Sequence, residues 1–154
     1  MAETAESRLA EMGIELPVPP PPAASYIPTV TTGNLLFVSG QVSILPSGEK
    51  YIGKLGREYG VEDGQKAARI CAINILAQIK AALGSFDRVT RIVKLTGFVN
   101  AMPEFTEAHK CINGCSNFLI EVLGERGRHA RSAIGIDAVP LGAAVEVEVI
   151  VEIA

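Results

Sequence analysis

The sequence predicts an α+β sandwich in which a mixed sheet of about six strands carries two helices packed on one face. Two stretches of about 20 residues keep apolar side chains at the i, i+3, i+4 spacing of a helix. Short β-branched runs lie before, between and after them, and the last run alternates apolar and charged residues. With 154 residues, 48% of them hydrophobic, the chain can build one compact core.

The first 24 residues are predicted to be an extension of the main domain. Thr4–Met12 can form a short helix that ends at Gly13. Pro17 and the four prolines at 19–22 then forbid a helix and favour an extended chain. We therefore divide the sequence into an N-terminal extension, 1–24, and a domain, 25–154.

The domain is expected to open with two antiparallel strands. Tyr26–Thr32 and Leu35–Ser39 are apolar and β-rich, and the pair Gly33-Asn34 between them suits a tight hairpin. The glycine-rich stretch Gly40–Gly60 is expected to be a loop with at most one brief strand, near Ile52–Leu55.

Two helices flank a central strand in the prediction. The first covers Glu62–Leu83, and the strand Val89–Val99 follows it. The second begins at Pro103, which the first turn of a helix tolerates, and runs about 20 residues to a stop at Gly124. Gly114 is expected to be a weak point inside this helix.

The last two predicted strands are Ala130–Val139 and Ala143–Ile153, joined around Pro140-Leu141-Gly142. The final strand has the clearest period-two pattern, because five apolar residues share one face and the opposite face carries Glu146, Glu148, Ile150 and Glu152. The polar face is the expected place for assembly or chemistry.

Composition excludes several functional classes. A net charge of -3 and a pI near 5.4 make nucleic acid an unlikely partner. No apolar run approaches about 18 residues and the N-terminus does not look like a signal peptide, so we expect a cytoplasmic protein that spans no membrane. Three cysteines, an odd number, fit free thiols in a reducing compartment. Glycine spacing gives no phosphate loop, so no nucleotide cofactor is indicated.

Arg131 and Glu146 are the candidate catalytic residues. Both belong to the last two predicted strands, which we expect to be neighbours, so that a guanidinium and a carboxylate border one cavity. The planar fork of arginine matches a carboxylate in a bidentate arrangement, and a small carboxylate substrate is the expected partner. The alternative is a structural Arg131–Glu146 ion pair at a subunit contact.

Three segments carry a resemblance to a known family. Leu35-Leu36-Phe37-Val38-Ser39-Gly40-Gln41, Arg131-Ser132-Ala133 and Val145-Glu146-Val147-Glu148 resemble the motifs of the reactive-intermediate deaminase (RidA/YjgF) family. The resemblance covers roughly residues 25–154. It implies a chorismate-mutase-like sandwich of the Bacillus type and a homotrimer with active sites between subunits.

The resemblance also implies a reaction. Family members hydrolyse reactive 2-enamine or 2-imine acids, such as 2-aminoacrylate, to 2-oxo acids and ammonia, with no metal or organic cofactor. By resemblance, Arg131 holds the substrate carboxylate and Glu146 positions the attacking water. Tyr26 closes the pocket, while backbone groups at Gly40 and Ala133 contact the substrate.

The sequence departs from the family pattern in three places. His109 stands near the position of a pocket-facing asparagine, the stretch from His109 to Arg131 is about five residues longer, and the N-terminal extension is additional. These departures leave the substrate open. The alternatives are a non-catalytic trimeric binder of small carboxylic acids, and an endoribonuclease or translation inhibitor, as some family members are described.

Two histidines have competing interpretations. His109 with Cys111 and Cys115 could suggest zinc, but a fourth ligand is missing and the cysteines fit the apolar stripe of the helix, so no metal site is expected. His129 could be a proton donor near neutral pH, or an exposed loop residue that precedes a strand.

Overall fold

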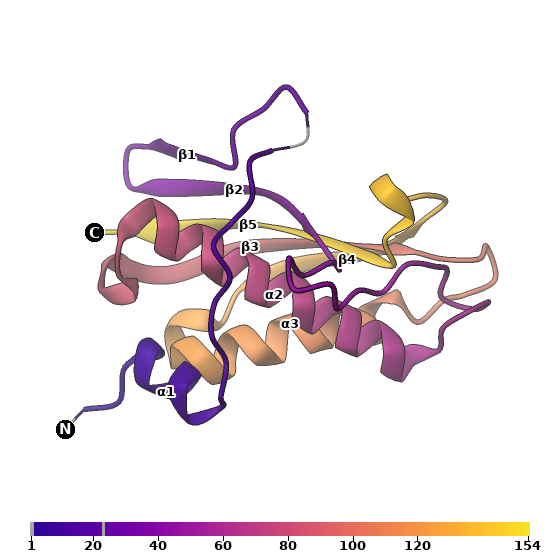
Figure 1. The fold of residues 1–154 in the computed structure, drawn as a ribbon, viewed down its shortest axis with the longest axis horizontal. Helices are drawn as coiled ribbons and strands as arrows, with labels where there is room; N and C mark the ends of the chain where they lie inside the picture. Colours follow the sequence, from indigo (N-terminus) through magenta and orange to yellow (C-terminus); the bar gives the residue numbers. More distant parts are fainter. Residues whose placement is uncertain (1, 23) are drawn as a thin grey trace.

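The computed structural model describes residues 2–22 and 24–154 and forms a five-stranded sheet with two long helices on one face (Figure 1). The strand order is β1-β2-β5-β3-β4. The elements are α1 (Ala5–Glu11), β1 (Thr29–Thr32), β2 (Leu35–Val42), α2 (Val61–Leu83), β3 (Val89–Asn100), α3 (Ala108–Leu123), β4 (Ala130–Ile136) and β5 (Val145–Ile153). The predicted α+β sandwich is confirmed.

The sheet is mixed, because β3 and β4 run parallel and the other neighbouring pairs are antiparallel. It has five strands rather than about six. The predicted brief strand at Ile52–Leu55 consists of isolated bridges, Ile52 with Ala143 and Leu55 with Ala101. Gly53, between them, has a φ of 146°, outside the range of an extended strand, so the loop contacts the sheet only at separate points.

Some elements begin later in the sequence than predicted. The helix expected from Pro103 begins at Ala108, because residues 102–105 form a turn in which the Phe105 N–H donates to the Met102 carbonyl (3.0 Å). The first strand starts at Thr29 rather than Tyr26.

The two long helices cross in close contact at Gly114. A Cβ atom at this position would lie 2.0 Å from the Gln65 carbonyl oxygen of α2. The prediction of a weak point missed this role, since the absent side chain is what lets α3 approach the α2 backbone.

Gly114→Ala is therefore expected to lower the free energy of unfolding by at least about 2 kcal/mol, because the backbone of α2 must move to admit the methyl group. Urea unfolding followed by circular dichroism measures the loss. Gly135→Ala is the control, because its added Cβ would meet its nearest neighbour, Ala101, at an ordinary 3.5 Å. Equal stability of the two variants would contradict this account of the crossing.

The alternation in β5 separates the two faces of the sheet. Val145, Val147, Val149, Val151 and Ile153 are buried beneath the helices. None of the described helices covers the opposite face, which holds Glu146 and Glu148 together with apolar side chains from neighbouring strands. Phe37 and Ile134 belong to this uncovered face and are 39% and 46% exposed.

The N-terminal segment lies against the helices. In α1, Ala5 and Leu9 are buried in the common core, and Arg8 Nη1 donates to the Val122 carbonyl of α3 (2.9 Å). The chain then passes across α2 and reaches the β1–β2 hairpin (Figure 1). Within residues 2–22 and 24–154, no helix combines the length and the apolar character that a bilayer crossing requires.

Candidate functional site

A cavity of about 710 Å³ lies where the proline segment passes β2 and the start of β5. It contains three of the predicted site residues, Tyr26, Gly40 and Glu146. Its walls are mainly apolar and include Pro19–Pro22, Ile44, Leu45, Pro46, Pro140 and Leu141. Among the described residues that line it, none carries a positive charge, so the charged groups of the cavity are the carboxylates Glu146 and Glu148.

Gly40 leaves room for the Glu146 carboxylate because it has no side chain. It lies in an irregularity of β2, where the register with β5 shifts between Val38 and Gln41. A Cβ atom at Gly40 would lie 2.8 Å from both Cδ and Oε2 of Glu146. The carboxylate therefore packs directly over the Gly40 backbone.

The surroundings of Glu146 favour its protonated form. Burial raises the pKa of this carboxyl above its ordinary value of 4.5, and the nearby charge of Glu148 raises it further. A carboxylate with a raised pKa accepts a proton from water more readily, and later returns it more readily. Glu146 is thus suited to acid–base chemistry in the cavity.

Sequence reasoning missed several residues of this cavity. Glu148 was noted only for the polar face of its strand, although it lies two positions from Glu146 and therefore on the same side. Asn74 of α2 donates to the carbonyls of Val42 (3.1 Å) and Ile44 (2.9 Å), which holds the chain leaving β2. The pattern of α2 gave no signal that Asn74 faces this segment.

Arg131 lies away from this cavity. The expectation that its strand neighbours that of Glu146 was wrong, because β3 lies between β4 and β5. Arg131 pairs with Leu95, which is buried under the helices, whereas Glu146 pairs with Phe98 on the uncovered face. Within one chain, the guanidinium and the carboxylate therefore lie on opposite faces of the sheet.

Arg131 is held by uncharged acceptors. Its Nη1 donates to Ser116 Oγ (3.1 Å) and its Nη2 to the His109 carbonyl (2.8 Å), both on α3. Of the five N–H donors of a guanidinium, the other three have no partner among the described residues. None of the ion pairs within residues 2–22 and 24–154 includes Arg131. This half-buried cation at a sheet edge can still bind an anion.

The other two predicted contacts lie with Arg131. His109 is exposed near the start of α3 and contacts Arg131 through its carbonyl. Ala133 follows two residues after Arg131 in β4, on the same face, and packs against the core. The six predicted residues thus form two groups, Tyr26, Gly40 and Glu146 in the cavity, and His109, Arg131 and Ala133 beside α3.

His129 is partly buried rather than exposed. Its Nε2 lies 2.8 Å from Ser116 Oγ, and its Nδ1 lies 2.6 Å from the Gly127 carbonyl. Burial lowers its pKa below 6.5, and the positive charge of Arg131 lowers it further, outweighing the Gly127 contact. Ser116, which joins His129 to Arg131, was not singled out in the sequence because it falls within the apolar stripe of its helix.

The two cysteines that follow His109 in sequence are buried in the core. Cys111 and Cys115 face the helix packing, and burial raises the pKa of the Cys111 thiol to about 11. His109 is exposed, so the three side chains do not converge. Within the described part of the chain, no three His, Cys, Asp or Glu side chains are grouped as metal ligands.

Comparison with known proteins places this geometry in context. Residues 6–153 match the family model described as "YjgF/chorismate_mutase-like, putative endoribonuclease". Protein TCP17 of Trypanosoma cruzi is 46% identical over 96% of this chain and 92% of its own length.

Solved structures are similar over nearly the whole chain. The crystal structure of a putative endoribonuclease from Shewanella oneidensis is 35% identical, with a TM-score of 0.94 over 98% of this chain and all of the other. That of RidA from an Antarctic Psychrobacter species is 26% identical, with a TM-score of 0.62 over 88% of this chain and 94% of the other.

Proposed function

Since the chain belongs to the YjgF/chorismate mutase-like family, we propose that it hydrolyses reactive 2-enamine and 2-imine acids to 2-oxo acids and ammonia. The observation that carries this proposal is the separation of two complementary half-sites in one chain. Among residues 2–22 and 24–154, the cavity is lined by the carboxylate Glu146 and by no cation, whereas Arg131 has N–H donors that no described residue accepts, on the other face of the sheet. A second copy of the chain supplies what the first lacks.

The uncovered face supports assembly of such copies. Phe37 and Ile134 are apolar side chains left open on it, beside acidic and small polar residues. Exposed apolar groups on an uncovered sheet face are typical of a protein–protein contact. The strand that carries Arg131, β4, is an edge strand, so its guanidinium can reach a neighbouring copy. We propose a homotrimer with Glu146 of one copy facing Arg131 of the next.

The chemistry needs only these groups and water. Arg131 binds the carboxylate of the imine acid, and Glu146 takes a proton from the water that attacks the imine carbon. A carbon–oxygen bond forms, the electron pair of the C=N bond moves to nitrogen, and Glu146 gives its proton to that nitrogen. Glu146 then moves the hydroxyl proton to the same nitrogen, so that the C–N bond breaks, ammonia leaves with the bonding pair, and the oxygen forms the C=O bond of the 2-oxo acid. Imine hydrolysis has a low intrinsic barrier. The protein can therefore accelerate it largely by holding water and substrate close together in the right orientation.

Tyr26 and the proline segment bound the space beside Glu146. Tyr26 lines the cavity and is 51% exposed in the single chain. We propose that it closes over the bound substrate, and that backbone groups at Gly40 and Ala133 contact the reacting end. His109 is proposed to border the same pocket from the α3 side.

The direct test is the release of pyruvate and ammonia from 2-aminoacrylate generated in situ, with and without the purified protein. Acceleration above the solvent rate supports the proposal. Pyruvate binding without acceleration would identify a carboxylic acid binder instead. Cleavage of RNA that is lost in an Arg131→Ala variant would favour the endoribonuclease alternative.

Gly40→Ala tests the placement of Glu146. Its methyl group would displace the carboxylate, and a misplacement of about 1 Å costs on the order of 10²-fold in rate. We expect kcat/KM to fall about 10- to 100-fold, while the free energy of unfolding changes by less than about 1 kcal/mol, because the displaced group is the mobile end of a side chain. Unchanged kcat/KM would mean that the position of this carboxylate does not matter.

A further inference from the structure

We infer that Ser116 and His129 are positioning residues that orient the Arg131 guanidinium through a chain of hydrogen bonds. The inference rests on the proposed function, since it assigns a purpose to the groups behind the anion-binding side chain. Ser116 Oγ lies 3.1 Å from Arg131 Nη1 and 2.8 Å from His129 Nε2. One hydroxyl therefore links an arginine and a histidine that flank Ala130 in sequence.

The donor and acceptor of each of these hydrogen bonds follow from the Gly127 carbonyl, at which the series ends. The Gly127 carbonyl can only accept, so His129 Nδ1 carries a proton and donates it over 2.6 Å. In neutral histidine, Nε2 is then an acceptor, and the Ser116 hydroxyl donates to it. The oxygen of Ser116 is left to accept from Arg131, which can only donate.

Burial makes this arrangement specific. Ser116 is 7% exposed and lies in α3 among apolar residues that include Cys115 and Leu119. A buried hydroxyl without hydrogen bonds is unfavourable by about 1–3 kcal/mol, so its orientation is tied to its partners. The lowered pKa of His129, which burial causes, keeps the neutral ring available as the acceptor.

These hydrogen bonds use two of the N–H donors of the guanidinium, and the other three have no partner among the described residues. Ser116 and the His109 carbonyl take one donor from Nη1 and one from Nη2. A flexible arginine loses side-chain conformational entropy when it binds an anion. A guanidinium that two acceptors already hold loses less of this entropy, so it binds the anion more tightly. Ser116 thus contributes to carboxylate affinity without touching the substrate.

A purely structural tie between α3 and β4 is the competing explanation. Such a tie would affect stability and leave the affinity for carboxylates unchanged. Positioning predicts that the loss appears in KM and in the dissociation constant of the product, because carboxylate binding is the step that needs the oriented fork. It also predicts that a hydroxyl restored at position 116 recovers the affinity.

Three variants separate these explanations. Ser116→Ala removes the hydroxyl, Ser116→Thr retains it, and Asn117→Ala is the matched control, because Asn117 is the next residue of α3 and is exposed. We expect Ser116→Ala to raise KM and the Kd for pyruvate about tenfold, as the loss of one hydrogen bond in the chain permits, with kcat within about twofold. Ser116→Thr and Asn117→Ala should remain within about threefold of the unaltered protein in both constants.

Nitrogen-15 NMR of the His129 ring gives a readout that needs no activity. The chain predicts a neutral ring protonated at Nδ1, with an Nε2 resonance that shifts in Ser116→Ala and not in Asn117→Ala. Protonation at Nε2 would overturn the inference, whether or not the protein is a deaminase. In an active protein that Arg131→Ala inactivates, unchanged KM and Kd in Ser116→Ala would also overturn it. If neither the native protein nor any variant accelerates hydrolysis, the proposed function fails. The NMR result still shows whether the hydrogen bonds from His129 through Ser116 to Arg131 run in the inferred direction.

Discussion

Replacement of Arg131 by alanine is expected to lower kcat/KM for 2-aminoacrylate by about 10²–10⁴-fold. The substrate carboxylate would lose two charge-assisted hydrogen bonds, each worth about 1.5–3 kcal/mol. Arg131→Lys should recover only part of the loss, because an ammonium keeps the charge but not the planar fork. Steady-state rates of pyruvate release measure both variants.

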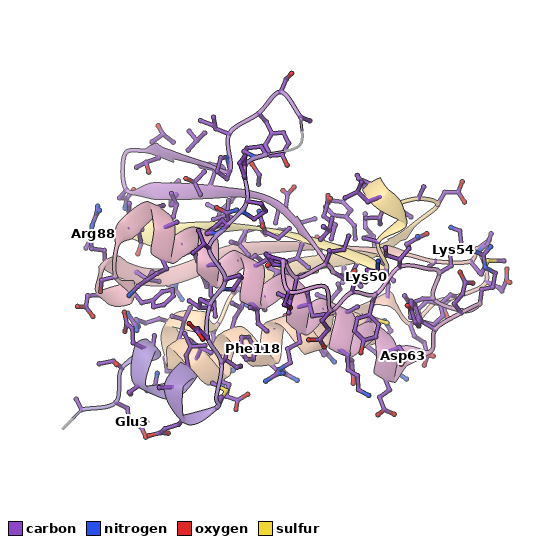
Figure 2. The ribbon with its side chains drawn as sticks, viewed as in Figure 1. Glu3, Lys50, Lys54, Asp63, Arg88 and Phe118 are labelled. Carbon is purple, nitrogen blue, oxygen red and sulfur yellow. The ribbon has the colours of Figure 1, made fainter. Side chains whose placement is uncertain are left out.

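The fold should survive the change at position 131. Arg131 is half-buried and forms no ion pair with the described residues, so its removal releases only two neutral acceptors, Ser116 and the His109 carbonyl. Arg88→Ala is the control, since Arg88 is exposed at the end of the sheet beside the C-terminus (Figure 2). Equal activity of Arg131→Ala and Arg88→Ala would show that the arginine does not bind substrate.

Glu146→Gln is expected to separate activity from stability. The amide cannot take a proton from water, so kcat should fall about 10²–10⁴-fold, the usual contribution of a general base. At neutral pH, however, the variant should unfold at a higher temperature than the native protein. Partial burial disfavours the charged form of the native carboxyl and raises its pKa, whereas an uncharged amide avoids this unfavourable burial.

The sign of the pH dependence follows from that raised pKa. Below about pH 4.5, the carboxyl is protonated in both the folded and the unfolded state. Its ionisation then does not lower the stability of the native protein relative to the Glu146→Gln variant. As the pH rises through the folded-state pKa, the native protein loses stability, and the difference in Tm grows to a plateau.

Glu152→Gln is the matched control, because Glu152 lies on the same face of β5 and outside the cavity. A Tm difference for Glu146→Gln that does not vary with pH would contradict the burial of this carboxylate.

The elements that the sequence predicted well are those with one dominant periodicity. In β5, valine alternates with glutamate, so the strand and its buried face could be assigned before the structure was known. The apolar stripe of α2 was equally clear, and the structure confirms that helix within one residue at its start. The loop between β2 and α2 has no such period, and its separate contacts with the sheet could not be anticipated.

The arrangement of the site was predicted less completely, for two physical reasons. Segment β3–α3–β4 is a strand, helix and strand, a pattern that favours parallel neighbours, but it does not show on which side of β3 the last strand, β5, pairs. In addition, β4 has no buried residue, and its half-buried side chains, Arg131 and Ala133, alternate with exposed Ser132 and Ile134, so apolar residues do not mark one face. The face to which Arg131 points therefore could not be derived from its sequence.

The contacts that hold the site together are mostly between residues distant in sequence. Gly40 lies against Glu146, more than one hundred positions later, and Asn74 holds the chain that leaves β2. In sequence, Ser116 is a polar residue within a helical stripe, and only the fold brings Arg131 of β4 and His129, which precedes β4, beside it. Such contacts depend on how the elements pack, which residue type and spacing do not encode.

A mixture of two inactive variants tests the shared site most directly. Arg131→Ala and Glu146→Gln are unfolded together, refolded at equal concentration and assayed for pyruvate release, with each variant refolded alone as the reference. If Arg131 and Glu146 act from different copies, random assembly leaves both residues intact at about a quarter of the interfaces, so about a quarter of the native activity should return. A mixture no more active than the two variants refolded separately would contradict the shared site.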